Sequence, residues 1–95
     1  MPSDRSWFEG FPLFGGVLVF PATAKTAAVR LGREAVTIRQ WARRYGVRVL
    51  GRASREVVYD FADLATIEGC IWRGDDVPDS PEGRDALRAR LAAAA

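Results

Sequence analysis

Two short amphipathic helices joined by a tight turn form the pattern that most restricts how this chain folds. The apolar residues of the first helix follow the spacing i, i+3, i+4, i+7: Ala24, Ala27, Ala28 and Leu31. Thr23 precedes them, and its hydroxyl is suited to accept a hydrogen bond from a free amide of the first turn. Gly32 follows them, and glycine readily adopts the left-handed conformation that ends many helices. We therefore predict a first helix over residues 24–31.

The second helix repeats this spacing and carries a different outer face. Its apolar stripe consists of Ile38, Trp41, Ala42 and Tyr45. Its opposite face is basic and rich in hydrogen-bonding groups: Val36, Thr37, Arg39, Gln40, Arg43 and Arg44. Glu34 lies near the start, where negative charge suits the helix dipole, and Gly46 follows the last turn. We predict a helix over residues 35–45 that buries one face and exposes the basic one.

Two β-prone runs, residues 47–50 and 56–59, follow the second helix. Five residues that include a glycine separate them, which fits a β-hairpin with a longer loop. Asp60 is a suitable N-cap for a third helix, and Asp63 stands where a capping box would place an acid. The apolar residues that this third helix is expected to bury are Phe61, Leu64, Ile67, Ile71 and Trp72.

The flanks of this unit differ in character. The amino-terminal segment concentrates large apolar side chains, which we expect to pack back onto the domain or to form a dimer contact: Trp7, Phe8, Phe11, Leu13 and Phe14. Residues 17–20 read as a short strand that Pro21 ends. Residues 74–80 form a polar linker, and Ser80, Pro81 and Glu82 are a start signal for a last helix.

These elements predict an α+β fold, mainly helical, with a short β-hairpin beside the helix pair, an amino-terminal strand and a carboxyl-terminal helix. The expected division is an aromatic extension over residues 1–21, a compact unit over 22–73, a linker over 74–80 and a helix over 81–95. Ninety-five residues are enough for one domain with a modest core.

Charge is distributed very unevenly along the chain. Residues 22–55 hold nine Lys and Arg against one acid, a balance of +8 within a total of +2. Residues 1–21 sum to −1 and residues 56–95 to −5. A local positive field of this kind attracts a polyanion even where the net charge is small.

Composition excludes several classes of function. There is no histidine and one cysteine, Cys70, so intrachain disulfides are excluded and the usual zinc and His-based catalytic sites are not expected. We expect no metal, no cofactor and no enzymatic activity. The longest apolar run is far shorter than a bilayer span and lacks a basic n-region, so we expect a cytoplasmic protein without a membrane partner. Cys70, Trp41, Tyr45 and Tyr59 are expected to pack in the core.

The order of short blocks along residues 23–71 resembles a known class. The chain reads AAVRLG, then TIRQWARR, then VRVLGR, and finally a tyrosine and DFADL. This order resembles the small winged-helix proteins of the excisionase and MerR-like helix-turn-helix class. In that class an alanine pair packs under the turn, and a Gly-Arg wing leads through a tyrosine to an Asp-Leu helix. The resemblance covers about half of the chain and implies a winged helix-turn-helix fold.

The resemblance also implies roles for individual residues. The second helix would enter the major groove of double-stranded DNA, and the wing would lie along the backbone or minor groove. The helix residues in this role are Ala35, Val36, Thr37, Gln40 and Arg43, flanked by Arg39 and Arg44. The wing residues are Arg48, Arg52, Ser54 and Arg55. Arginine suits guanine or phosphate and glutamine suits adenine, so the choice between base and backbone contact stays open for each arginine.

We therefore expect sequence-specific binding of double-stranded DNA by an excisionase-like recombination directionality factor or a compact transcription regulator. Specificity from a head of this size requires a homodimer or cooperative assembly on DNA, and a recombinase or another protein is a further expected partner. The alternative is a protein-interaction adaptor, for example of phage type, that keeps the winged-helix shape. The adaptor would bind its partner through Trp7, Phe8, Phe11 and Phe14.

Overall fold

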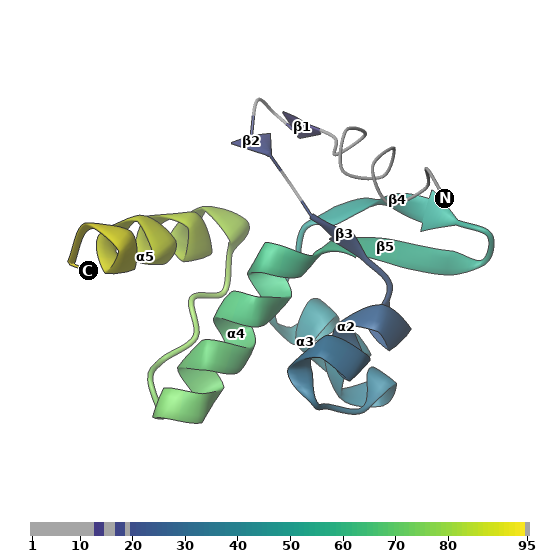
Figure 1. Cartoon of the computed structure of the whole chain (residues 1–95), viewed down its shortest axis with the longest axis horizontal. Helices are drawn as coiled ribbons and strands as arrows, with labels where there is room; N and C mark the ends of the chain where they lie inside the picture. Colours follow the sequence, from purple (N-terminus) through teal and green to yellow (C-terminus); the bar gives the residue numbers. More distant parts are fainter. Residues whose placement is uncertain (1–12, 15–16, 19, 95) are drawn as a thin grey trace, which may run out of the picture.

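The computed structural model describes residues 13–14, 17–18 and 20–94, with the backbone alone for the first four of these. Its elements in chain order are β1 (Leu13–Phe14), β2 (Val17–Leu18), β3 (Pro21–Ala22), α2 (Ala24–Leu31), α3 (Ala35–Tyr45), β4 (Val49–Ala53), β5 (Glu56–Asp60), α4 (Phe61–Arg73) and α5 (Pro81–Ala94). Among the described residues they form an α+β fold of four helices and a three-stranded antiparallel sheet, with β1 and β2 paired separately (Figure 1).

The two predicted helices over residues 24–31 and 35–45 are confirmed as α2 and α3. Thr23 caps α2, because the Thr26 amide donates to its hydroxyl at 3.2 Å while its own amide donates to the Thr26 hydroxyl at 2.9 Å. Gly32 ends α2 in the left-handed conformation, with φ 67°. The side chain of Glu34 makes no capping hydrogen bond at the start of α3. Local sequence signals are therefore sufficient to fix the limits of both helices.

The sheet has the order β3-β5-β4. The prediction that Pro21 ends a strand is wrong, because Pro21 and Ala22 pair with Asp60 and Tyr59 of β5. Proline is tolerated there because β3 lies at an edge of the sheet, where a missing amide breaks no central ladder. The predicted run over residues 17–20 appears as β2 over Val17–Leu18, with residue 19 outside the described residues.

The hairpin is tighter than predicted. β4 continues to Ala53, which pairs with Glu56, so a two-residue turn at Ser54 and Arg55 replaces the expected five-residue loop. The register is irregular between Val49 and Gly51. The longer strands make the hairpin a paired arm that extends beyond the helices (Figure 1).

The core lies where α2, α3, α4 and β5 meet. The side chains of Ala27, Ile38, Leu64 and Ile67 are fully buried there. Asp60 caps α4 as predicted, since its carboxylate accepts from the Ala62 amide at 3.1 Å. Cys70 is buried, as expected.

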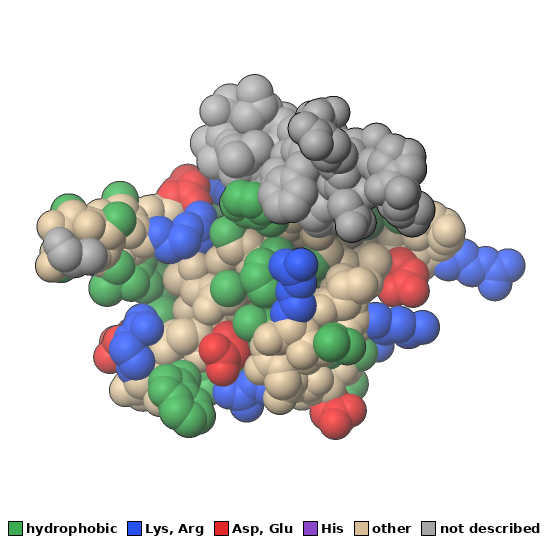
Figure 2. Space-filling model, viewed as in Figure 1, with side chains coloured by type: hydrophobic (Ala, Val, Ile, Leu, Met, Phe, Trp, Pro, Cys, Tyr) green, Lys and Arg blue, Asp and Glu red, His purple; other side chains and the backbone are tan. Residues whose placement is uncertain are grey.

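Two predictions about α4 are wrong. Ile71 and Trp72 are exposed, Trp72 at 80%, because the buried stripe of α4 runs through Asp63, Leu64, Ile67 and Cys70 and leaves the next two residues on its outer side. A hydrophobic side chain accordingly protrudes at the lower end of α4 in Figure 2. Asp63 is also not a capping-box residue, since its carboxylate accepts from other elements instead.

Candidate nucleic-acid interface

One face of α3 is turned to solvent. Val36, Arg39, Gln40 and Arg43 are all exposed, and their spacing i, i+3, i+4, i+7 places them in one stripe along the helix. The opposite stripe holds Ile38 and Trp41, which are buried. The structure thus separates the two faces of α3 as the sequence predicts, and the basic one is accessible.

The arginines of this face differ in their contacts. Within the part of the chain that the structure describes, Arg39 and Arg43 make no hydrogen bond, ion pair or ring contact. The Arg44 guanidinium lies 5.6 Å from the centre of the Tyr45 ring. Arg43 and Arg44 occupy the last turn of α3, where positive charge also suits the helix dipole. Arg39 and Arg43 therefore remain available to an external ligand.

Two residues assigned to this face are only partly accessible. Ala35 and Thr37 are half-buried, and Ala35 packs against the core. Of the seven α3 residues predicted to meet DNA, these two lie closest to the body of the protein. They shape the edge of the exposed stripe and leave its centre to Val36, Gln40 and Arg43.

Packing holds the exposed stripe in place. Ile38 and Trp41 anchor α3 in the core, and the Arg33 guanidinium lies 5.5 Å from the centre of the Trp41 ring. The same guanidinium meets the Glu68 carboxylate of α4 at 3.4 Å. Arg33 thus covers Trp41 and links the turn between α2 and α3 to α4.

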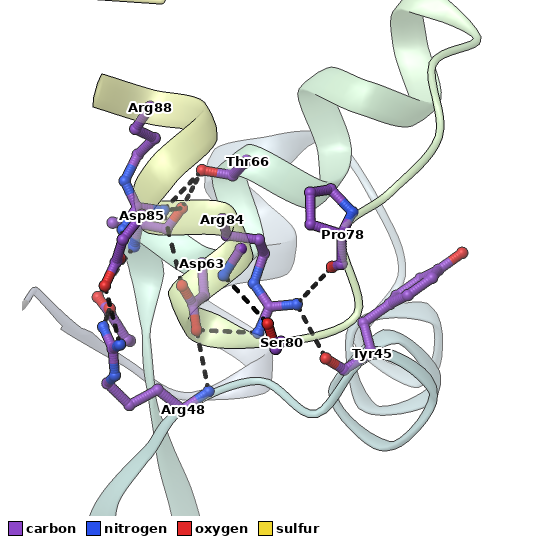
Figure 3. Close-up of polar contacts among 12 residues, drawn as sticks. Tyr45, Arg48, Asp63, Thr66, Pro78, Ser80, Arg84, Asp85 and Arg88 are labelled. Atoms are coloured by element: carbon purple, nitrogen blue, oxygen red, sulfur yellow. Dashed lines mark hydrogen bonds and ion pairs between the residues drawn. The ribbon is translucent and has the colours of Figure 1, made fainter. Parts of the chain in front are cut away.

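The carboxyl end of α3 is held by a side chain from α5. Arg84 is completely buried and donates hydrogen bonds to the carbonyl oxygens of Tyr45 at 2.8 Å, Gly46 at 3.0 Å and Pro78 at 2.8 Å. Its Nη2 also donates to the Asp63 carboxylate at 3.2 Å. Figure 3 shows the guanidinium between these groups, with the end of α3 on one side and α4 on the other. The last carbonyls of a helix have no partner within it, so Arg84 acts as a cap from outside.

Asp63 is the centre of a larger ionic network. One of its carboxylate oxygens also accepts from the Arg48 amide at 3.0 Å, and the other lies 3.6 Å from Nη1 of Arg88. Arg88 in turn pairs with Asp85 on the same helix and donates to the Thr66 hydroxyl at 2.9 Å. Asp63 and Arg84 are both fully buried, so each is the counter-charge that makes burial of the other tolerable.

Arg48, which the resemblance places among the DNA-contacting residues of the wing, belongs to this network. Its guanidinium meets the Asp60 carboxylate at 3.2 Å and the Asp85 carboxylate at 3.1 Å, and its side chain is only 12% exposed. Burial lowers the pKa of Arg48, but the hydrogen bond and charge of Asp85, with the charges of Asp63 and Asp60, raise it above its ordinary value. Arg48 is therefore a charged structural residue at the base of the hairpin, and its guanidinium is paired with two carboxylates of the protein.

Asp60 lies beside these groups with a raised pKa. Burial is the main cause, and the negative charge of Asp63 adds to it. The amides of Ala62 and Phe20 and the guanidinium of Arg48 act in the opposite direction without cancelling the shift. The Asp60 carboxylate is therefore easier to protonate in the folded chain than in the unfolded one.

The hairpin carries the remaining predicted residues. Arg52, Ser54 and Arg55 are exposed, and Nη2 of Arg52 donates to the Arg55 carbonyl oxygen at 3.4 Å. Gly51 has φ 155° at the irregular register of β4, a conformation that residues with a Cβ rarely adopt. Figure 2 shows basic side chains projecting from the hairpin end at the right of the view, near an acidic one. Unlike Arg48, these residues are placed where a ligand can reach them.

A groove connects the hairpin to the helices. It has a volume of about 340 Å³ and is lined by residues of α2, α3 and the hairpin, among them Lys25, Arg39, Arg55 and Glu56. Lys25 and Glu56 form an exposed ion pair across it at 3.8 Å. The basic stripe of α3 and the basic hairpin end are thus continuous through this groove.

Other predicted residues lie elsewhere. Trp7, Phe8 and Phe11 are outside the described residues, and Phe14 is described only as part of the β1 backbone. Over the described ranges 13–14, 17–18 and 20–94, no helix combines the length and apolar character needed to cross a bilayer.

Comparison of the chain with protein-family models, curated proteins and solved structures finds no match.

Two residues that matter at this site were not assigned a role from the sequence. Lys25 counted only as part of the basic segment, because nothing local places it opposite the hairpin. Arg84 belongs to the predicted last helix, whose start signal at Ser80, Pro81 and Glu82 says nothing about a buried arginine. A signal was present, since Arg84, Leu87 and Leu91 share the spacing of one helix face, so Arg84 stands in the apolar stripe.

Proposed function

We propose that this protein binds double-stranded DNA as a small winged helix-turn-helix module, with α3 in the major groove and the hairpin of β4 and β5 as the wing along the backbone. The observation that carries the proposal is the pair Arg39 and Arg43. Both are exposed on one helix face, and neither has a partner among the described residues. A rigid helix with an unpaired basic stripe matches the depth of the major groove and the charge of the phosphates beside it.

The contacts that hold α3 in place favour a DNA-binding surface over a basic helix face that is only exposed to solvent. Three arginines near α3 form ion pairs within the protein: Arg33, Arg48 and Arg84. Arg39 and Arg43 of the exposed stripe form none among the described residues. Arg84 and Trp41 fix the helix at its end and along its inner face. A site held by packing presents its side chains with less loss of conformational freedom on binding.

The roles within the interface follow from position. Gln40 and Arg43 lie on the exposed stripe and are suited to base edges, while Arg52 and Arg55 at the hairpin end are suited to phosphates. We propose action as an excisionase-like factor or a compact transcription regulator, in a homodimer or a cooperative assembly on DNA. A module of this size contacts few base pairs, so neighbouring copies raise the selectivity.

The test is fluorescence anisotropy of the full chain on a random-sequence duplex at several salt concentrations. Wild type should bind with an affinity that falls with salt, at a log–log slope of roughly −0.9 per neutralised phosphate. A preferred site is then selected from a pool of random duplexes. On that site Arg43→Ala should weaken binding about 5- to 150-fold, the range that corresponds to a base contact of about 1–3 kcal/mol. Arg90→Ala is the matched control, because Arg90 is exposed on α5, away from the stripe.

The adaptor alternative makes a different prediction in the same assay. If wild type fails to bind duplex at low salt, or if Arg43→Ala and Arg90→Ala behave alike, the DNA-binding proposal is refuted. Binding of a protein partner through apolar side chains would respond weakly to salt.

A further inference from the structure

The groove between α2, α3 and the hairpin brings together cations from three elements. Lys25 comes from the first turn of α2, Arg39 from the exposed stripe of α3 and Arg55 from the hairpin turn. Arg39 and the side chain of Arg55 have no partner within the described residues. The groove has a volume of about 340 Å³, and its mouth is open to solvent, so a small anion can enter it.

Lys25 is poorly placed for the stability of its own helix. A cation in the first turn meets the positive end of the helix dipole, and α2 has no acid in that turn to offset it. The carboxylate that does approach Lys25 comes from Glu56 of β5, at 3.8 Å, and the two side chains are 71% and 36% exposed. Residues that break a local rule in this way are common at functional sites.

We infer that this groove binds one backbone phosphate of duplex DNA, and that Glu56 competes with that phosphate for Lys25. In the free protein the Glu56 carboxylate forms an ion pair with the Lys25 ammonium group. The guanidinium groups of Arg39 and Arg55 have no partner among the described residues. When DNA binds, the phosphate takes the place of the Glu56 carboxylate beside Lys25 and is also attracted by Arg39, Arg55 and the start of α2. This inference rests on the proposed function and adds to it a phosphate site and an internal competitor.

The inference predicts opposite effects for the two partners of the ion pair. Lys25→Ala should weaken binding to a random-sequence duplex and reduce the salt slope by about 0.9, the change expected for one lost phosphate contact. Glu56→Gln should strengthen binding about 1.5- to 5-fold, the range that corresponds to an exposed ion pair of about 0.2–1 kcal/mol. Both side chains lie outside the core, so each variant should stay folded, with a free energy of unfolding that changes by no more than about 1 kcal/mol.

The controls separate competition from a change in net charge. Glu82→Gln removes an exposed acid on α5 and should leave the affinity for duplex unchanged. In the Lys25→Ala background, Glu56→Gln should lose most of its effect, because the competition acts through Lys25. An undiminished gain in that background, or an equal gain from Glu82→Gln, overturns the inference.

Failure of this inference is distinguishable from failure of the proposed function. If wild type binds duplex and Arg43→Ala loses binding while Lys25→Ala and Glu56→Gln match wild type, only the phosphate groove is refuted. If wild type does not bind duplex, both the proposed DNA binding and the phosphate groove are refuted. Inorganic phosphate is the second probe: binding of free phosphate that Lys25→Ala abolishes, with duplex affinity unaffected, would assign the groove to a small anion and overturn the assignment to the DNA backbone.

Discussion

Replacing Arg84 by methionine should destabilise the chain far more than any change on its surface. The buried guanidinium donates four hydrogen bonds, three to backbone carbonyls and one to Asp63. Methionine keeps an unbranched apolar stem but ends short of the guanidinium, so the loss falls mainly on the polar contacts. It leaves the Asp63 carboxylate buried, with the longer contact of Arg88 at 3.6 Å as its remaining ion pair.

The expected size of the effect follows from the buried charge. Removing one partner of a buried ion pair costs about 3–5 kcal/mol. At about 0.05–0.15 kcal/mol per residue, a chain of 95 residues has a free energy of unfolding of about 5–14 kcal/mol. Arg84→Met should therefore remove at least about a fifth of the stability, whereas an exposed substitution stays within about 0.5 kcal/mol.

Urea unfolding followed by far-ultraviolet circular dichroism measures this difference. Arg90→Met on the same helix is the matched control, since Arg90 is exposed and has no hydrogen bond or ion pair among the described residues. Asp63→Asn combined with Arg84→Met should recover part of the loss, because it removes the unpaired charge. A loss below about 1 kcal/mol for Arg84→Met, or one equal to that of Arg90→Met, would refute the reasoning.

Two further predictions concern the hairpin and its base. Gly51→Ala should destabilise the chain by about 1–3 kcal/mol in urea unfolding through backbone strain alone, because φ is 155° and nothing lies within 4 Å of the added Cβ; an unchanged midpoint would contradict this. The raised pKa of Asp60 means that the folded chain binds a proton at this carboxylate more readily than the unfolded chain does. The free energy of unfolding that this group contributes is therefore largest below its ordinary pKa of 3.8. It falls as the pH rises through the raised pKa. Wild type should therefore gain stability relative to Asp60→Asn as the pH is lowered through this window, and a constant difference in urea unfolding between the two would show that the shift is absent.

The parts of the fold that could be predicted are those set by neighbours in sequence. The Thr23 cap, the Gly32 turn and the limits of α2 and α3 follow from residues within one or two helical turns. The division of α3 into a buried and an exposed face follows from its periodicity in the same way.

The parts that could not be predicted depend on contacts between distant segments. Arg48 and Arg52 both looked like hairpin cations, and only the approach of Asp60 and Asp85 removes Arg48 from the surface. Pro21 forms an edge strand because β5 lies beside it. Trp72 is exposed because Cys70 fills the buried position of the last turn of α4, a choice that periodicity alone did not resolve.

The buried Arg84 also determines where the chain can be divided. The charge and composition of residues 74–80 suggest a place to separate a compact unit from a trailing helix. A fragment ending there would retain Asp63 without Arg84 and the end of α3 without its external cap. The contacts of Arg84 and Arg88 therefore join α5 to the rest of the fold across residues 74–80. Fusion partners and tags are better attached beyond α5 than inserted before it.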